Sequence, residues 1–189
     1  MTNTQIKLII GPMFSCKTTE LIRTLERFEA VGFKTVAIKH EIDLRYGDDC
    51  TIETHSGIKY PAFQLANLMS GLADMEKYDI IGIDEGQFFS DLHEFVTQMA
   101  FHARKTVIIS ALSGTYEQKI FSSIADVIPL ATEIVTLTAI CRVCRIADAP
   151  YTVALGEMPQ TAVKVGGSSD YMPVCLHCLP RITKVNVYK

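Results

Sequence analysis

The chain has 189 residues, of which 48% are hydrophobic and 21% charged, with a formal net charge of −3. This length suits one well-packed domain with a small appendage, and the slightly acidic balance gives no electrostatic support for binding nucleic acid or a membrane surface. The sequence starts without a charged-then-apolar leader, and no apolar run approaches the ~18 residues that span a bilayer. We therefore expect a soluble, cytoplasmic protein.

Short apolar runs predict the buried strands of a parallel sheet. They cover residues 6–10, 34–40, 79–83, 106–112 and 133–139. Segments of helical length separate them, and this alternation of strands and helices is typical of an α/β layer fold.

Two helices are predicted between these strands. In the first, which follows Lys17, the residues Leu21, Leu25 and Phe28 recur at a spacing that puts them on one helical face. Gly32 is a residue type that typically ends a helix, so we expect this helix to end there. The second is expected over residues 88–104, where apolar side chains again gather on one side.

The stretch GPMFSCKT, residues 11–18, has the length, the lysine and the hydroxyl residue of a phosphate-binding P-loop. It follows a predicted strand and opens a predicted helix, so backbone N–H groups and the positive helix end would face the phosphates. Gly11 can make the tight turn, Lys17 can reach the β- and γ-phosphates, and Thr18 can hold Mg²⁺. Cys16 stands where the pattern has a second glycine, which leaves an ordinary strand–loop–helix junction as the alternative.

A pair of carboxylates follows the strand predicted at 79–83. A buried strand that ends in Asp84 puts a carboxylate at the carboxyl edge of the sheet, where ligands of open α/β sheets bind. Asp84 could help to hold Mg²⁺, and Glu85 could take a proton from an attacking hydroxyl. We assign Ser15 and Gln87 to the same nucleotide site. Two compatible motifs in this order make a nucleotide site a much stronger prediction than either motif alone.

Four of the six cysteines form two C-x-x-C units with 30 residues between them, Cys141 with Cys144 and Cys175 with Cys178. Without a signal peptide, such pairs indicate thiolates around a metal and not a disulfide framework. The spacing matches a structural Zn²⁺ site of the ribbon kind, whose closed ligand set leaves no position for chemistry. His177 could compete as a ligand, and four buried or free thiols are the alternative.

The character of the sequence changes near Thr138. Beyond it lie both C-x-x-C units, β-like runs at 151–155 and 161–165, and a Gly-Gly-Ser-Ser loop. We therefore expect a nucleotide-binding α/β domain over residues 1–138 and a small zinc-binding domain over residues 139–189.

Taken together, these motifs resemble those of the cytosolic-type (type II) thymidine kinases over nearly the whole chain. The resemblance lies in the stretches KLIIGPMFSCKTTELIR, IGIDEGQFF, GTYEQKIF, LTAICRVC and VGGSSDYMPVCLHC. It implies a P-loop (RecA-like), mostly parallel sheet flanked by helices, with a small C-terminal zinc-ribbon or lasso domain. It also implies transfer of the γ-phosphate of ATP to the 5′-hydroxyl of thymidine, giving dTMP in nucleotide salvage, with deoxyuridine as an alternative acceptor.

The resemblance implies a role for each matching residue. Glu85 would be the base for the 5′-hydroxyl, Lys17 would hold phosphates, and Arg45 would steady the transferring charge. The residues expected to bind ATP and Mg²⁺ are Gly11, Ser15, Cys16, Lys17, Thr18, Asp84 and Gln87, with Thr18 and Asp84 on the Mg²⁺. The residues expected to bind thymidine are Met13, Asp43, Phe88, Tyr116, Val165, Gly166, Gly167 and Tyr171. The stretch 165–167 would close over thymine as a lasso, and Cys141, Cys144, Cys175 and Cys178 would bind structural Zn²⁺.

Plainer interpretations stay open for several of these residues. Met13 and Phe88 would also suit core positions, and Tyr116 and Tyr171 would also suit half-buried surface positions. Asp43 and Arg45 could form a solvated turn. The resemblance further implies a homotetramer and feedback inhibition by thymidine triphosphate, with no nucleic-acid or membrane partner.

The chain departs from the family pattern at three positions. Cys16 replaces a glycine, which would strain the backbone if the position needs a positive φ. Its thiol would lie at a helix N-terminus beside Lys17, so we predict a kinase that thiol oxidation or alkylation switches off. Ala154 stands where many relatives have arginine, and Ser113 where relatives often have aspartate. These departures leave a weakened nucleoside-binding relative as the main rival, and a zinc-ribbon ATPase on nucleic acid as a third interpretation.

Overall fold

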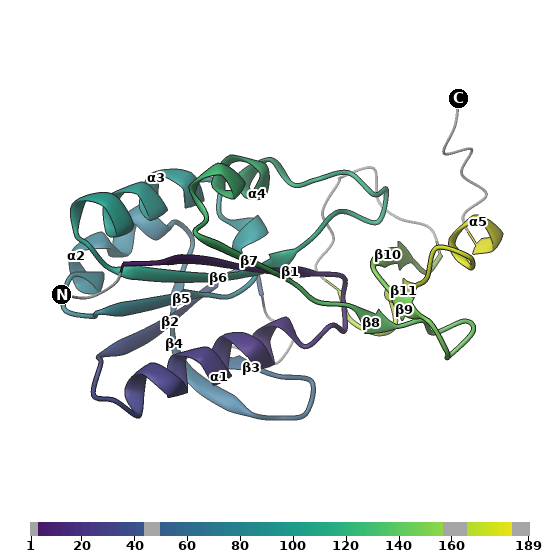
Figure 1. The fold of residues 1–189 in the computed structure, drawn as a ribbon, viewed down its shortest axis with the longest axis horizontal. Helices are drawn as coiled ribbons and strands as arrows, with labels where there is room; N and C mark the ends of the chain where they lie inside the picture. Colours follow the sequence, from purple (N-terminus) through teal and green to yellow (C-terminus); the bar gives the residue numbers. More distant parts are fainter. Residues whose placement is uncertain (1–3, 44–49, 157–165, 183–189) are drawn as a thin grey trace.

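The computed structural model describes residues 4–43, 50–156 and 166–182. Its main sheet consists of β1 (Ile6–Gly11), β2 (Thr35–His40), β3 (Thr51–Glu53), β4 (Lys59–Leu65), β5 (Ile80–Ile83), β6 (Thr106–Leu112) and β7 (Glu133–Thr136). These seven strands lie in the order β3-β4-β2-β5-β6-β1-β7 (Figure 1). The β3–β4 pair is antiparallel and the other pairs are parallel. The predicted α/β class with a mostly parallel sheet is confirmed.

Helix α1 (Lys17–Glu29) covers one face of the sheet (Figure 1). Its side chains Leu21 and Leu25 are fully buried, as their helical spacing predicts, and pack with Ile9 of β1 and Ile108 of β6. The hairpin of β3 and β4 contributes Ile52 to the same cluster. These two strands were not predicted from the sequence.

The other face is covered by α2 (Leu72–Met75), α3 (Leu92–Val96) and α4 (Ser122–Val127) (Figure 1). The short helical segments there are η1 (Leu68–Gly71), η2 (Gly86–Phe88), η3 (Thr97–His102) and η4 (Ile128–Leu130). Phe89 and Phe95 are the largest fully buried side chains of this layer.

Two predicted elements differ in their bounds. The helix expected over 88–104 begins at Leu92, because Phe88 belongs to a separate 3₁₀ turn and Phe89 is extended. Its second half is the π-helix η3, in which the backbone N–H of Ala103 donates to the carbonyl oxygen of Gln98. The strand expected over 133–139 ends at Thr136, and the chain then leaves the sheet.

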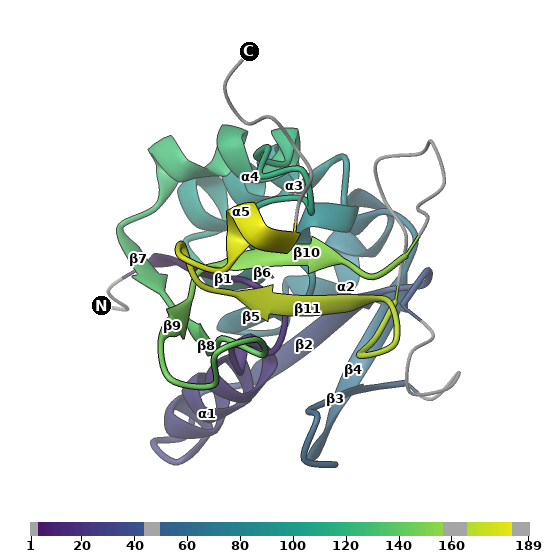
Figure 2. The ribbon, with the colours of Figure 1, turned by 90° about the vertical axis from the view of Figure 1, so that its right-hand side faces the viewer.

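Beyond the carboxyl ends of the parallel strands lies a smaller unit of two antiparallel hairpins (Figures 1 and 2). It contains β8 (Ala139–Ile140), β9 (Asp148–Ala149), β10 (Tyr151–Ala154), β11 (Tyr171–Val174) and α5 (Leu179–Ile182). Its buried core is built from Val153, Val174 and three of the paired cysteines. The β-like run at 161–165 lies outside the described residues. The division into two domains near residue 138 stays a prediction.

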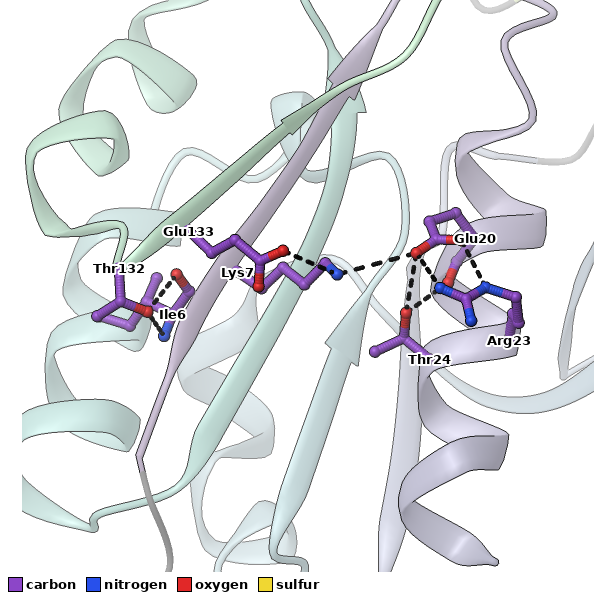
Figure 3. Close-up of polar contacts among 7 residues, drawn as sticks. All are labelled: Ile6, Lys7, Glu20, Arg23, Thr24, Thr132 and Glu133. Carbon is purple, nitrogen blue, oxygen red and sulfur yellow. Dashed lines mark hydrogen bonds and ion pairs between the residues drawn. The ribbon is translucent and has the colours of Figure 1, made fainter.

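A polar network ties the edge strand β7 and α1 to the neighbouring strand β1 (Figure 3). The ammonium of Lys7 on β1 lies 3.3 Å from a carboxylate oxygen of Glu133 on β7 and 3.8 Å from one of Glu20 on α1. Thr132 accepts a hydrogen bond from the Ile6 backbone N–H at 3.0 Å, which secures the start of β7. Among the helices of the described ranges, none combines the length and apolar character needed to cross a membrane.

Candidate functional site

The predicted P-loop connects β1 to α1 at the carboxyl edge of the sheet. Gly11 is the last residue of β1, and a Cβ there would lie 2.6 Å from the carbonyl oxygen of Leu137 and 2.5 Å from the hydroxyl of Ser15. A side chain at position 11 would therefore force the backbone apart. Phe14 and Cys16 both have left-handed backbone conformations, with φ of 67° and 60°.

The conformation of Cys16 explains why the P-loop pattern has a glycine at this place. The residue precedes α1 with φ 60° and ψ 30°, a region that costs a residue with a Cβ about 1–2 kcal/mol. The strain expected from the sequence is therefore present. The side chain of Cys16 is exposed, on the surface of the cavity described below.

Lys17 and Ser15 fold back onto their own loop. The Lys17 ammonium donates to the carbonyl oxygen of Pro12 at 2.8 Å, and the Ser15 hydroxyl donates to the same oxygen at 2.8 Å. Both side chains are buried. This arrangement holds the ammonium at the loop, where a phosphate group would meet it.

The end of β5 meets the first turn of α1 through Asp84 and Thr18. The hydroxyl of Thr18 lies 3.2 Å from each carboxylate oxygen of Asp84. Asp84 is 3% exposed, so its carboxylate depends on neighbouring donors for its hydrogen bonds. A hydroxyl beside a buried carboxylate is a donor set that fits Mg²⁺, which prefers oxygen ligands.

Glu85 turns away from the strand in a left-handed conformation, with φ of 51°. Its carboxylate accepts a hydrogen bond from the Gln87 side-chain amide at 2.6 Å. The amide is itself oriented, because its oxygen accepts the backbone N–H of Leu112 at 3.1 Å. Gln87, which we assigned to the nucleotide, thus contacts Glu85 and fixes the direction of that carboxylate.

These residues open on a cavity of about 290 Å³. The P-loop from Met13 to Thr19 lines it, together with Glu85. The end of β3 and the turn that follows it also line the cavity, through Glu53, Thr54, His55 and Ser56. The His55 ring stacks on Phe14, with 5.0 Å between the ring centroids. This turn was not predicted as part of the site, because no local motif marks it in the sequence.

The smaller C-terminal unit contacts the P-loop through Met13. The Met13 backbone N–H donates to the Thr152 hydroxyl on β10 at 2.9 Å, and Met13 is 7% exposed. The side chain of Gln118 then donates to the carbonyl oxygens of Thr152 and Tyr116, at 3.1 and 2.9 Å. Met13 and Tyr116, two residues expected at the nucleoside, are therefore joined to the same strand.

Other residues expected at the nucleoside lie on different elements. Tyr171 is buried on β11, opposite Ala154 on β10. Phe88 is half-buried beside the His40 ring, and burial lowers the pKa of His40 despite the nearby Glu41 carboxylate.

The remaining predicted residues fall on loops or outside the described part. Asp43 is 8% exposed after β2. A Cβ on Gly166 would lie 2.8 Å from a carboxylate oxygen of Asp170, which accepts the Gly167 backbone N–H at 3.3 Å. Arg45 and Val165 lie outside the described residues.

The four paired cysteines come together in the C-terminal unit. Their sulfur atoms all lie within 4.8 Å of one another, and the Cys144 and Cys175 sulfurs are 3.9 Å apart. Tetrahedral Zn²⁺ with Zn–S bonds of about 2.3 Å would separate sulfurs by about 3.8 Å. Burial opposes the Cys141 thiolate, but backbone N–H groups around it, first that of Cys144, lower the pKa of Cys141 to about 6. Burial and neighbouring thiols raise the pKa of Cys178 to about 12. The sulfur cluster, with backbone donors around it, fits a structural Zn²⁺.

Known proteins resemble this chain over most of its length. The sequence model of the thymidine kinase family matches residues 4–179. The thymidine kinase of Vaccinia virus (strain Western Reserve) is 41% identical over 178 residues, which is 94% of this chain and 98% of the viral protein. The cytosolic thymidine kinase of Bos taurus is 41% identical over 177 residues, 94% of this chain and 72% of the bovine protein. The thymidine kinase of Myxoma virus (strain Lausanne) is 40% identical over 174 residues, 92% of this chain and 95% of that protein.

Proposed function

The chain belongs to the thymidine kinase family, and from that premise we propose that its P-loop and its Asp84–Glu85 pair transfer the γ-phosphoryl group of ATP to the 5′-hydroxyl of thymidine. Membership makes the chain an ATP-dependent kinase that acts on thymidine. The observation that supports this site is that Glu85 lines the P-loop cavity with its carboxylate oriented by Gln87.

The proposed mechanism depends on positioning, because phosphoryl transfer leaves the protein little covalent work. The P-loop N–H groups and the Lys17 ammonium bind the phosphates at the N-terminus of α1. Glu85 accepts the proton of the 5′-hydroxyl as that oxygen attacks the γ-phosphorus, and the bond from this phosphorus to the β–γ bridging oxygen breaks to release ADP. Thr18 and Asp84 are the ligands that would hold Mg²⁺, which when bound neutralises charge on the phosphate oxygens. Arg45 would bind the transferring group.

The nucleoside is assigned to the space beside Met13, between the main sheet and the C-terminal unit. Met13, Phe88 and Tyr116 would surround the thymine, and Tyr171 and Asp43 would contact the sugar side of the substrate. The stretch 165–167 would close over the base with backbone groups, for which glycines are suited. The hydrogen bonds that join Met13, Gln118 and Tyr116 to β10 support this assignment, because they couple the P-loop to the unit that would close.

We further propose that Cys141, Cys144, Cys175 and Cys178 hold one structural Zn²⁺, which stabilises the fold of the C-terminal unit. Four further proposals follow from membership of the family. They are a division into two domains near residue 138, assembly into a homotetramer, inhibition by thymidine triphosphate and a cytoplasmic location. Deoxyuridine is a second candidate acceptor.

The rival interpretation, a weakened binding protein, is not favoured. Lys17, Thr18, Asp84 and Glu85 are all present and gathered around one site. Of the two departures that most suggested weakness, Cys16 precedes α1 in a left-handed conformation, and Ala154 lies on β10 opposite Tyr171.

The test is transfer of radiolabelled phosphate from ATP to thymidine with Mg²⁺ and a reducing agent. We compare the wild type with Glu85→Gln and, as a matched control, with Glu94→Gln on the exposed side of α3. We expect turnover by the wild type and the control, and a loss of about 10²- to 10⁴-fold in Glu85→Gln. Equal rates in Glu85→Gln and the wild type would contradict the assignment of the base.

A further inference from the structure

Ser110 is a buried hydroxyl next to both carboxylate residues of the site. It lies on β6, whose residue Ile109 is paired with Ile83 of β5, so Ser110 is the neighbour of Asp84 across the sheet. Its exposed fraction is 0%, and its neighbours on the strand, Ile109 and Ala111, are apolar and fully buried. A hydroxyl in this position would cost free energy if it had no hydrogen-bond partners.

Ser110 has one partner from each of the two carboxylate residues. Its hydroxyl donates to the Oδ1 atom of Asp84. Its oxygen also lies 3.4 Å from the backbone nitrogen of Glu85, whose N–H donates to it. Because the oxygen accepts that N–H, the hydroxyl hydrogen is left free to point at Asp84.

The two contacts act on different features of the site. The bond to Oδ1 fixes the rotation of the Asp84 carboxylate, whose oxygens also lie 3.2 Å from the Thr18 hydroxyl. The bond from the Glu85 N–H holds the backbone where Glu85 adopts its left-handed conformation. A hydrogen bond to a charged group is stronger than one between neutral groups.

We propose that Ser110 is a positioning residue that sets the Asp84 carboxylate for the nucleotide-bound divalent cation and anchors the turn that carries Glu85. The proposal rests on the proposed function of Asp84. Outer-shell partners of metal ligands affect metal affinity by about 10- to 100-fold when they are removed. Ser110 would thus contribute to catalysis without touching substrate.

The test measures cation binding apart from turnover. The free Mn²⁺ signal in electron paramagnetic resonance is titrated with enzyme and a non-hydrolysable ATP analogue, without thymidine. The variants are Ser110→Ala, Ser110→Thr, which keeps the hydroxyl, and Thr106→Val. Thr106 is the matched control, because it is a buried hydroxyl at the other end of β6 that accepts the Gln5 backbone N–H at 3.3 Å. Thermal melts verify that each variant is folded.

We expect Ser110→Ala to weaken Mn²⁺ binding by about 10-fold or more, with kcat lowered and the KM for thymidine nearly unchanged. Ser110→Thr should retain most of the affinity, and Thr106→Val should change only the melting temperature. Wild-type affinity in Ser110→Ala, or equal losses in Ser110→Ala and either of the other variants, would overturn the proposal. Failure of the wild type to phosphorylate thymidine would instead refute the proposed function, and the Mn²⁺ comparison would still be readable.

Discussion

The hydroxyl of Thr18 lies 3.2 Å from both carboxylate oxygens of Asp84, although the two residues are 66 positions apart in the chain. The contact joins the first turn of α1 to the end of β5. It therefore places a helix N-terminus, a lysine and a buried carboxylate around one point, where the phosphates of ATP and Mg²⁺ are expected.

Removal of the Thr18 hydroxyl should impair catalysis more than folding. Thr18→Val keeps the shape of the side chain but loses the oxygen beside Asp84, so we expect kcat to fall by about 10- to 100-fold at saturating thymidine. Thr18→Ser keeps the oxygen and should remain close to the wild type. The measurement is steady-state kinetics over a range of Mg²⁺ concentrations. Equal activity of the valine and serine variants would contradict a role for the hydroxyl.

Cys16→Gly should stabilise the protein. The position has a φ of 60°, which favours glycine, so relief of the strain should raise the free energy of unfolding by about 1 kcal/mol. Cys16→Ala is the control, because it removes the thiol but keeps the Cβ that causes the strain. Urea denaturation of the three proteins gives the comparison. A gain in stability for alanine as large as that for glycine would show that the thiol, and not the backbone, is responsible.

Alkylation of Cys16 should block the kinase. The side chain is exposed and lines the P-loop cavity, so a bulky adduct would occupy space that the phosphates need. We expect a maleimide to inactivate the wild type, with protection by ATP, and to leave Cys16→Ala active. Cys50 is also exposed, so Cys50→Ala should be inactivated like the wild type. Full activity after mass spectrometry has shown complete modification of Cys16 would disprove this prediction.

The residues of the site that directly follow a strand or open a helix could be predicted from the sequence. Lys17 and Thr18 follow a strand and open a helix, and Asp84 and Glu85 end a strand, so their place at the sheet edge follows from the α/β pattern. The β5 and β6 strands were predicted for the same reason, because their apolar runs are continuous.

Other parts depend on pairing across the sheet, which no local pattern encodes. Ser110 reaches Asp84 only through the register of β5 with β6, and a serine inside an apolar run gives no sign of its partner. His55 reaches Phe14 through an antiparallel hairpin that the sequence analysis did not predict. The predicted start of the helix at Phe88 was wrong, because Phe88 has the spacing of a helical residue but belongs to the turn after Glu85.

Loss of the cysteine cluster should unfold the C-terminal unit. We expect one Zn²⁺ per chain by elemental analysis, and its loss together with a melting temperature lower by several degrees in Cys175→Ala, because structural Zn²⁺ contributes folding free energy. Cys50→Ala, which changes a cysteine outside the cluster, should keep both the metal and the stability. A Cys175→Ala protein that retains the wild-type melting temperature would argue against a structural metal.

The network around Glu20 should make stability depend on pH. The Glu20 carboxylate accepts two hydrogen bonds from the Arg23 guanidinium at 2.7 Å and lies 3.8 Å from the Lys7 ammonium (Figure 3). The bonds from Arg23, against the effect of burial, hold the pKa of Glu20 below its ordinary value of 4.5. The folded state therefore binds the proton less readily than the unfolded chain does, so the ionised carboxylate stabilises the fold above that value. This contribution disappears as the pH falls through the lowered pKa.

Glu20→Gln should accordingly lower the free energy of unfolding at neutral pH by about 0.2–1 kcal/mol, the usual range for a pair at the protein surface. The difference from the wild type should shrink as the pH falls below 4.5 and vanish once Glu20 is protonated in both states. Urea denaturation at a series of pH values measures this, with Glu26→Gln on the exposed side of α1 as the control. High salt should reduce the difference at neutral pH, because ions screen the pairing of exposed charges. A difference that stays constant from neutral to acidic pH would mean that Glu20 acts through packing and not through its charge.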